Sequence, residues 1–410
     1  MGIRVGICGV GSFASSFIPL FKAHPEVASV TLCDLDAAKL REKSELFGIA
    51  RTCPSLDELC QTDVDAIAIF TQNWMHGPQA VQALKSGKHV YSAVPPAITM
   101  EEITDLVRTV EQTGRIYMIG ETSFYYPCAL YCRERFRKGD FGRILYAEGE
   151  YLHDFDHGLY DVFKWRGGNR WKEIAGSPPM HYPTHSMSMV VSVTGAHATH
   201  VSCLGIVDRH EDGLFRKGVN RWDNEFSNET ALMRMSDGSA ARINEFRRIG
   251  HPGAVRMSMY GTLGSYEEQH GNKIWVTKDR ESRQDITELL DCRGVPACEK
   301  RHTTAERVGG KAVFAGFSRV HPVERLPKEY IGLANEHGGS HQFLAHDFVK
   351  ACASNEPPPN NVWQAARYLV PGLIAHESAK RGGELMEIPD FGDLRIPSYP
   401  RASNTGPPTT

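Results

Sequence analysis

The chain has 410 residues, of which 41% are hydrophobic and 23% charged, so it can bury a core, and two domains are the natural expectation. Its net charge of −3 gives no reason to expect nucleic acid or an anionic membrane as a partner. We find no signal peptide and no apolar run long enough to span a bilayer, and no two of the 10 cysteines form a C-x-x-C pair. These features predict a reduced, cytoplasmic protein without structural disulfides.

Residues 1–122 alternate short β-like runs with helical stretches. Helices are expected over residues 12–24, 37–48, 75–87 and 99–114, each between two strand-like runs such as IRVGICGV at the start and RIYMIGE at the end. Strands separated by helices at this rhythm are typical of βαβ units. The first domain is therefore predicted to be an α/β Rossmann domain with a doubly wound parallel sheet.

The pattern changes in a second expected domain, residues 123–395. A helix over 126–139 precedes β-like runs over 143–153, 197–208, 229–248 and 254–269. The Asp-Gly dipeptide inside 229–248 predicts a hairpin, and 264–276 predicts a second one. The domain should therefore be α+β with a mostly antiparallel sheet. The remaining expectations are an irregular excursion or lid over 280–335, helices over 340–353 and 361–381, and a flexible tail over 396–410.

A glycine string between the first strand and the first helix points to a dinucleotide. It has the form G-x-G-x-x-A and comprises Gly9, Val10, Gly11, Ser12, Phe13 and Ala14. Gly9 would allow the tight turn, and Gly11 would let the backbone approach a pyrophosphate at the helix N-terminus. Asp34 ends the second strand, where an acid can bind the ribose 2′-hydroxyl and repel a 2′-phosphate. We therefore expect NAD, bound by Gly9, Gly11, Ser12, Phe13, Ala14 and Asp34.

Further cofactor contacts are expected at the carboxyl edge of the sheet, where ligands bind in such folds. Thr71, Asn73 and His76 follow one strand, and we add Ala93 and Glu121 from the ends of the next two. The alternative is that Asn73 caps a helix and that His76 is an exposed residue of its first turn.

The stretch GKHVYSAVPPAI, residues 87–98, has no Lys, Asp, Glu or His after Tyr91, so the acid–base chemistry must come from elsewhere. His181, Tyr182 and His185 cluster around Pro183, and imidazole and phenol groups together suit proton transfer. The alternative for each histidine is a structural role. No H-E-x-x-H or comparable spacing occurs, so we predict no metal site.

A second group of residues suggests a sugar site. Tyr151 and His153 are followed by Lys164, Trp165 and Arg166, which mix aromatic rings with cations. Aromatic rings can stack on sugar faces while cations hold an anionic group; the alternative is a solvated, charged loop. His337 lies near a glycine turn and could instead only cap the next helix.

These motifs resemble the glucose–fructose oxidoreductase, inositol dehydrogenase and rhizopine-catabolism (Gfo/Idh/MocA) family. The resemblance covers nearly the whole chain and includes GICGVGSFA, the segment 70–95 and the segment 341–391. It implies an N-terminal NAD-binding domain and a C-terminal domain whose sheet carries a carbohydrate site, with Tyr125 added to the substrate contacts, and a homo-oligomer, either a dimer or a tetramer. The family's Glu-Lys-Pro reads Ala93-Val94-Pro95 here, and the Asp of its Asp-x-x-x-His is His181, so a plain dehydrogenase mechanism is in doubt.

One branch is more similar. The NAD-dependent glycosidases of this superfamily, such as bacterial α-N-acetylgalactosaminidases, also have Val before Pro, a Tyr-Pro-Thr-His string like residues 182–185, and a Glu-Gly-x-Tyr-x-His string like residues 148–153. The branch implies glycoside cleavage by transient oxidation at C3, elimination, water addition and re-reduction. Tyr182 or His185 would be the base, with His181 and His153 assisting, and the basic segment suggests an anionic glycoside, sulfonated or uronic. The alternatives are an NAD-dependent sugar dehydrogenase and a non-catalytic, dinucleotide-binding sensor.

Overall fold

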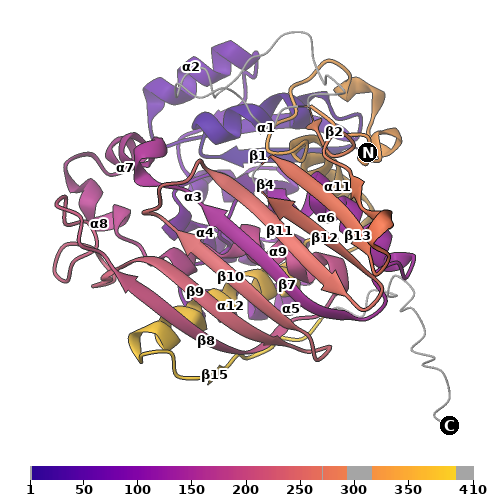
Figure 1. Ribbon diagram of the computed structural model, residues 1–410. Helices are drawn as coiled ribbons and strands as arrows, with labels where there is room; N and C mark the ends of the chain where they lie inside the picture. Colours follow the sequence, from indigo (N-terminus) through magenta and orange to yellow (C-terminus); the bar gives the residue numbers. More distant parts are fainter. Residues whose placement is uncertain (1, 270, 293–315, 394–410) are drawn as a thin grey trace.

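The computed structural model describes residues 2–269, 271–292 and 316–393 (Figure 1). Part of the expected excursion, residues 293–315, and the expected tail, residues 396–410, lie outside these ranges. The described residues form two β-sheets with helices packed around and between them.

Sheet A is the predicted parallel sheet and has six strands. In spatial order they are β3 (Thr52–Cys53), β2 (Val27–Cys33), β1 (Ile3–Cys8), β4 (Ala66–Ile69), β5 (His89–Ser92) and β6 (Tyr117–Ile119). All four residues of β4 and of β5 are buried, as expected for parallel strands covered on both faces. The short strand β3 escaped prediction because two residues carry no periodicity.

The helices of this region match the expected positions. They are α1 (Ser12–Ala23), α2 (Ala37–Phe47), α4 (His76–Lys85) and α5 (Met100–Thr113), with a short α3 (Leu56–Gln61) that the sequence pattern did not reveal. Local signals set their ends. In α5, the Thr99 side chain accepts a hydrogen bond from the backbone N–H of Glu102 at 3.2 Å, and Gly114 closes the helix in the left-handed conformation.

Sheet B confirms the mostly antiparallel second sheet. Its nine strands, in spatial order, are β14 (Gln284–Asp285), β13 (Asn272–Thr277), β12 (Gly264–Gln269), β11 (Ala254–Gly261), β7 (Ile144–Leu152), β10 (Ala240–Phe246), β9 (Phe226–Met235), β8 (Ala198–Val207) and β15 (Met386–Glu387). Both predicted hairpins are present, β9–β10 around Asp237–Gly238 and β12–β13. The pair β7 and β10 is parallel.

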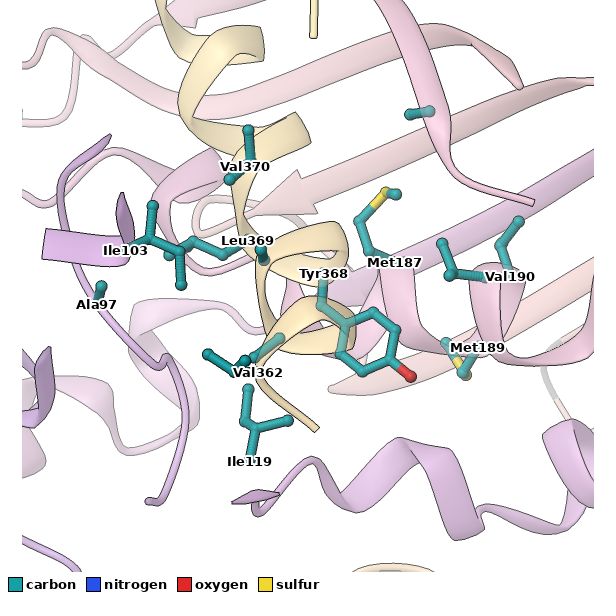
Figure 2. Close-up of a cluster of buried hydrophobic side chains, with 14 of the residues drawn as sticks. Ala97, Ile103, Ile119, Met187, Met189, Val190, Val362, Tyr368, Leu369 and Val370 are labelled. Atoms are coloured by element: carbon teal, nitrogen blue, oxygen red, sulfur yellow. The ribbon is translucent and has the colours of Figure 1, made fainter. Parts of the chain in front are cut away.

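The helices of the second half are α6 (Pro127–Arg137), α7 (Leu159–Gly167), α8 (Trp171–Ala175), α9 (Thr184–Thr194), α11 (His341–Ser354) and α12 (Val362–Lys380). Two of them return to the first half. In Figure 2, Tyr368 and Leu369 of α12 lie among side chains from both sides, including Ile103 of α5 and Met187 of α9. On α11, Phe348 contacts Phe21 of α1 with ring centroids 6.2 Å apart. The core is therefore continuous across residue 122, and the division into domains there stays a prediction.

Among the helices of the described ranges, none combines the length and the apolar character needed to cross a bilayer.

Candidate active site

The glycine turn after β1 has the geometry that a dinucleotide requires. Gly9 has φ +88°, and a Cβ on it would lie 2.9 Å from the backbone carbonyl of Phe70, so only glycine fits. A Cβ on Gly11 would meet only the Trp165 ring, at 3.8 Å, so the backbone there is open to an approaching group. The turn leads directly into α1, whose N-terminus favours an anion.

Asp34 lies beside this turn at the end of β2. Its carboxylate accepts hydrogen bonds from the backbone N–H groups of Val10 and Asp36, both at 2.9 Å. These bonds hold the acid next to the glycine turn, where the ribose of a dinucleotide would lie. The turn and this acid therefore fit NAD, and Ser12, Phe13 and Ala14 form the first turn of α1 beside them.

The carboxyl edge of sheet A is held together by His76. Its ring nitrogens lie 2.8 Å from the Pro95 carbonyl oxygen and 3.1 Å from the Thr71 carbonyl oxygen. The side chain is buried, so the alternative of an exposed first-turn histidine is wrong. The Asn73 side chain accepts from the backbone N–H of Trp74, and Ala93 continues the ladder by donating to Ile69. Whether these four residues contact the cofactor stays a prediction.

The centre of the candidate site is a buried hydrogen-bonded pair, Glu121 and His185. Glu121 follows β6, and His185 is in the first turn of α9; Nδ1 of His185 lies 2.6 Å from Oε1 of Glu121. The same oxygen accepts from the backbone N–H and the hydroxyl of Ser123, at 2.9 and 2.8 Å. Since Nδ1 is engaged, Nε2 is the ring atom that can exchange a proton with a ligand.

The environment of this pair sets its proton affinity. Burial opposes a charge on His185, but the neighbouring Glu121 carboxylate outweighs it and raises the pKa of His185. Burial likewise opposes ionisation of Glu121, and the charge of His185 and its hydrogen bond leave the pKa of Glu121 lowered. The geometry is that of an imidazole base oriented by a carboxylate.

Two tyrosines and a second histidine surround His185. The rings of Tyr151 and Tyr182 each lie 5.4 Å from the His185 ring and 6.0 Å from one another. The Tyr151 hydroxyl lies 2.6 Å from Nδ1 of His153. Burial raises the pKa of Tyr151 to about 12 and raises that of Tyr182 further, while burial and then Arg247 lower the pKa of His153 to about 4. At neutral pH the phenols are therefore proton donors and His153 is neutral.

A glycine lets these groups meet. A Cβ on Gly149 of β7 would lie 2.4 Å from the Ser186 carbonyl oxygen, so α9 can rest on β7 only because this residue has no side chain. Tyr151 lies two residues along the same strand and so on the same face, beside His185. The Glu-Gly-x-Tyr-x-His string thus has a packing reason as well as a chemical one.

Two charged residues of this site were not predicted. Glu245 of β10 is fully buried, with its carboxylate 2.5 Å from the Ser186 hydroxyl and 3.1 Å from the Arg247 guanidinium, which stacks over the Tyr151 ring at 4.8 Å. Burial, opposed by Arg247, raises the pKa of Glu245 to about 7. The signal in the sequence is the pair Glu245 and Arg247, two residues apart at the end of a predicted strand, whereas the Asp-Gly pattern predicts only a hairpin here.

His181 does not join the cluster of Tyr151, Tyr182 and His185. Its ring packs against His376 of α12 with centroids 5.1 Å apart, and burial lowers its pKa well below the usual value. This position gives no support to a catalytic role for His181. The reason is the turn at Pro183, which separates the directions of residues 181 and 185 although they are four apart.

Tyr125 and His337 lie on the α11 side. The Tyr125 hydroxyl donates to Asp347 of α11 and the ring stacks on Phe343, so this buried side chain is engaged inside the protein and gains no support as a substrate contact. His337 is exposed and packs edge-on against Phe13 of the nucleotide turn at 5.4 Å. It is therefore near the expected cofactor, and its contact with substrate stays a prediction.

The basic segment forms α7 rather than a loop, and α7 lies over the nucleotide turn. Trp165 is beside Gly11, with the Lys39 ammonium 5.8 Å from its ring. Lys164 points instead toward Tyr160 and Trp171, at 5.7 and 5.6 Å from the ring centres. Of the three predicted contacts, Arg166 is the one whose charge interacts with Tyr182 and Tyr151. Burial lowers its pKa, and Tyr182 and Tyr151 lie close enough to oppose that effect.

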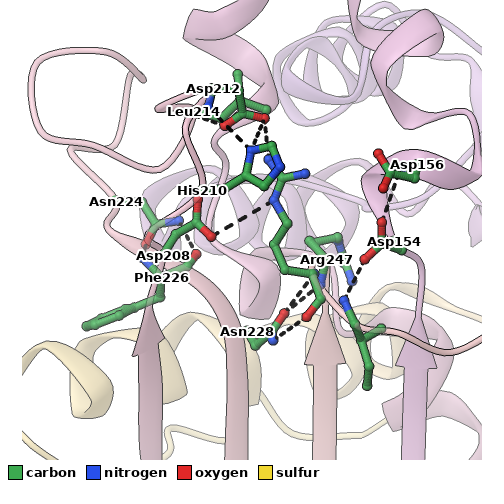
Figure 3. Close-up of polar contacts among 12 residues, drawn as sticks. Asp154, Asp156, Asp208, His210, Asp212, Leu214, Asn224, Phe226, Asn228 and Arg247 are labelled. Atoms are coloured by element: carbon green, nitrogen blue, oxygen red, sulfur yellow. Dashed lines mark hydrogen bonds and ion pairs between the residues drawn. The ribbon is translucent and has the colours of Figure 1, made fainter.

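Polar contacts at the end of sheet B hold α7 in place. Figure 3 shows this region, where Asp208, Asn228 and Arg247 lie at the strand ends and Asp212 lies in the loop after β8. The Arg248 guanidinium donates to the Tyr160 hydroxyl at 2.8 Å and pairs with Asp212, which also accepts from Tyr160. Arg248 therefore joins α7 to the loop after β8.

A recess on the other face of sheet B is separate from this site. It is lined by Glu148, Glu150, Arg242 and Arg256, which alternate with the residues that face α9. The expected homo-oligomer stays a prediction.

Comparisons with known proteins agree with the fold and the nucleotide turn. Residues 3–121 match the model of the oxidoreductase family with an NAD-binding Rossmann fold. The chain is 26% identical to a glycosyl hydrolase family 109 protein of Saccharopolyspora erythraea and 25% identical to glycosyl hydrolase family 109 protein 1 of Bacteroides thetaiotaomicron. In both cases the alignment covers 95% of this chain, with 83% and 84% of the relatives.

Among solved structures, levoglucosan dehydrogenase in complex with NADH and levoglucosan superposes with a TM-score of 0.72 at 18% identity, over 95% of this chain and all of that one. This similarity concerns the fold. Together with the glycine turn and Asp34, the matches show that residues 3–121 form an NAD-binding Rossmann domain of the Gfo/Idh/MocA oxidoreductase type, and that the chain is similar over most of its length to glycosyl hydrolase family 109 proteins.

Proposed function

We propose that the protein is an NAD-dependent glycosidase that cleaves its substrate through a transient oxidation. The observation that carries this proposal is the Glu121–His185 pair, flanked by Tyr151 and Tyr182 and located at the end of sheet A that binds the dinucleotide. The names of the relatives support glycoside hydrolysis. Val94 in place of a lysine further supports a route in which the acid–base groups come from the second half of the chain.

When bound, NAD supplies a hydride acceptor that is restored at the end of each turnover. The side chains of the protein would manage the protons. His185 has its Nδ1 held by Glu121, so Nε2 would remove the proton from C2 of the 3-keto sugar. The C2–H electron pair becomes the C1–C2 double bond, the bond from C1 to the aglycone oxygen breaks, and a phenol, Tyr182 or Tyr151, protonates the departing oxygen. Water then adds at C1 and gives its proton to the phenolate, and the proton on His185 returns to C2.

The structure favours His185 over Tyr182 as the base. A phenol whose pKa is raised far above its usual value holds its proton at neutral pH and so acts as a donor. An imidazole oriented by a carboxylate is the stronger base at that pH. Tyr151, bonded to His153, is placed to orient the sugar or to relay a proton.

The experiment that tests the proposal follows aglycone and nicotinamide together. We expect aryl glycosides to release their aglycone with no net NADH, and to exchange the C2 proton for deuterium in heavy water. NADH formed in proportion to a ketose product would show a sugar dehydrogenase with the same His185 base. If the protein binds NAD but turns over none of a broad panel of glycosides, the catalytic proposal is wrong and a non-catalytic, dinucleotide-binding sensor is the remaining alternative.

We further propose that the substrate carries an anionic substituent, held by Arg166. Arg166 is exposed, and Tyr182 and Tyr151, rather than a carboxylate, are the ionisable groups that act on this guanidinium among the described residues. An accessible guanidinium without an ion-pair partner can hold an anionic ligand group. Arg166→Ala should raise KM for uronic or sulfonated glycosides and leave neutral glycosides unchanged, with Arg166→Lys intermediate because a point charge lacks the bidentate fork. Equal effects on both substrate classes would remove the basis of this assignment.

A further inference from the structure

Three side chains with metal-ligating atoms meet between the nucleotide turn and α11. Glu336 and His337 are in the loop before α11, and His341 is the first residue of this helix; one ligand atom from each lies within 4.8 Å of the others. Their sequence spacing, Glu-His-x-x-x-His, does not predict a metal site. The three side chains meet because the intervening Gly338 and Gly339 both have positive φ, which turns the chain between the two histidines.

His341 is the observation that points to a ligand. Its side chain is fully buried, and among the described residues neither ring nitrogen has a hydrogen-bond partner. Leaving a buried polar group unpaired destabilises the folded state, so such groups normally have a partner. The ring lies against Phe17 at 4.4 Å and Phe13 at 5.4 Å, and neither phenylalanine can supply one.

The backbone of His337 gives a second indication. It has φ +48°, a conformation that non-glycine residues rarely adopt and that persists where surrounding structure imposes it. This conformation stacks the His337 ring on that of His341, with centroids 4.8 Å apart. The Glu336 carboxylate lies beside them, 3.1 Å from the hydroxyl of Ser16 on α1.

We propose that Glu336, His337 and His341 bind one divalent cation of the zinc class. Two imidazoles and one carboxylate suit zinc and its first-row neighbours, and three protein ligands leave a position for an oxygen atom of a ligand or of water. His337 contacts Phe13, so the cation would lie at the edge of the nucleotide site. The proposal is independent of the glycosidase function, because it concerns binding alone.

The test measures cation binding directly. The purified full-length protein is treated with a chelator, dialysed, and titrated with Zn²⁺ by calorimetry and with Co²⁺ by visible absorption, both with NAD bound and after NAD is removed. We expect one cation per chain and, with Co²⁺, absorption bands of a low-symmetry site. No binding near one equivalent would overturn the proposal.

Variants separate this site from accidental binding. His337→Ala removes an exposed ligand and should lower affinity by more than the about 10- to 100-fold that loss of an outer-shell partner costs. His341→Phe should abolish binding without lowering the stability of the metal-free protein, because it replaces an unpaired ring by an apolar one in aromatic surroundings. His200→Ala, on β8, is the matched control and should bind normally.

A contact with the cofactor is the competing explanation for His341. If His341→Phe and His337→Ala both bind Zn²⁺ as the parent protein does but lose NAD on dialysis, the pair belongs to the NAD site and the metal proposal is wrong. If His341→Phe fails to fold, His337→Ala alone decides, because its side chain is exposed.

Discussion

The described part of the chain contains two buried glutamate–histidine pairs, and they differ in what surrounds them. In the first, His185 Nδ1 lies 2.6 Å from Glu121; in the second, His376 Nδ1 lies 2.7 Å from Glu229. The second oxygen of Glu229 accepts from the backbone N–H of Met180 at 2.7 Å. The second oxygen of Glu121 is buried and has no partner among the described residues.

This difference teaches that a buried Glu–His contact does not by itself mark an active site. The Glu229–His376 pair joins β9 to α12 and anchors the turn that leads into α9, with its carboxylate satisfied on both sides. The Glu121–His185 pair faces Tyr151 and Tyr182 and lies at the carboxyl edge of the nucleotide-binding sheet. The Glu229–His376 arrangement stabilises the fold, whereas the Glu121–His185 arrangement leaves Nε2 of His185 without a hydrogen-bond partner among the described residues.

The largest expected effect is at His185. In His185→Asn the amide nitrogen replaces Nδ1 and keeps the bond to Glu121, while the atom that would accept the substrate proton is lost. We expect turnover of the aryl glycoside to fall about 10²–10⁴-fold, the usual contribution of a general base. Circular dichroism and the melting temperature should stay near those of the parent protein. Full activity in this variant would contradict the assignment of the base.

The matched change at His376 should act on stability instead. His376→Ala leaves the Glu229 carboxylate short of a partner in the core, which should cost about 2–5 kcal/mol in the free energy of unfolding. His376→Asn keeps a donor at the Nδ1 position and should recover most of this loss. Urea unfolding measures both, and kcat of the folded fraction should be unchanged. A large drop in kcat for His376→Asn would show that the Glu229–His376 pair also takes part in catalysis, and would contradict the difference proposed between the two pairs.

A smaller effect is expected for Glu121→Gln. The carboxylate raises the pKa of His185, so turnover of the parent protein should fall as the pH decreases through that raised pKa, where the imidazole takes up a proton. Without the charge, burial alone lowers the pKa of His185, and the acidic limb of the pH–kcat profile should move to lower pH. The plateau should fall about 10- to 100-fold, which corresponds to one charge-assisted hydrogen bond of about 1.5–3 kcal/mol. An acidic limb at an unchanged pH would show that His185 does not set it.

The sequence by itself determined the parallel and antiparallel sheets, the two hairpins and the nucleotide turn. Each of these features is predicted by a local sequence pattern: the spacing of apolar residues, the Asp237–Gly238 turn, or the glycines that follow β1. These patterns extend over only a few residues, so they can be recognised in the sequence without knowledge of the fold. The residue types at Tyr182 and His185 also indicated acid–base chemistry before their positions were known.

Only the tertiary structure decided which of these groups work together. His181 and His185 are four residues apart, yet the turn at Pro183 directs one toward α12 and the other toward Glu121. Glu121, expected at the cofactor, became the partner of a histidine 64 residues away, and His341 came to lie beside Phe13 of the nucleotide turn. Contacts between side chains distant in sequence depend on how helices pack on sheets, as α9 does on β7 at Gly149, and no local pattern contains that information.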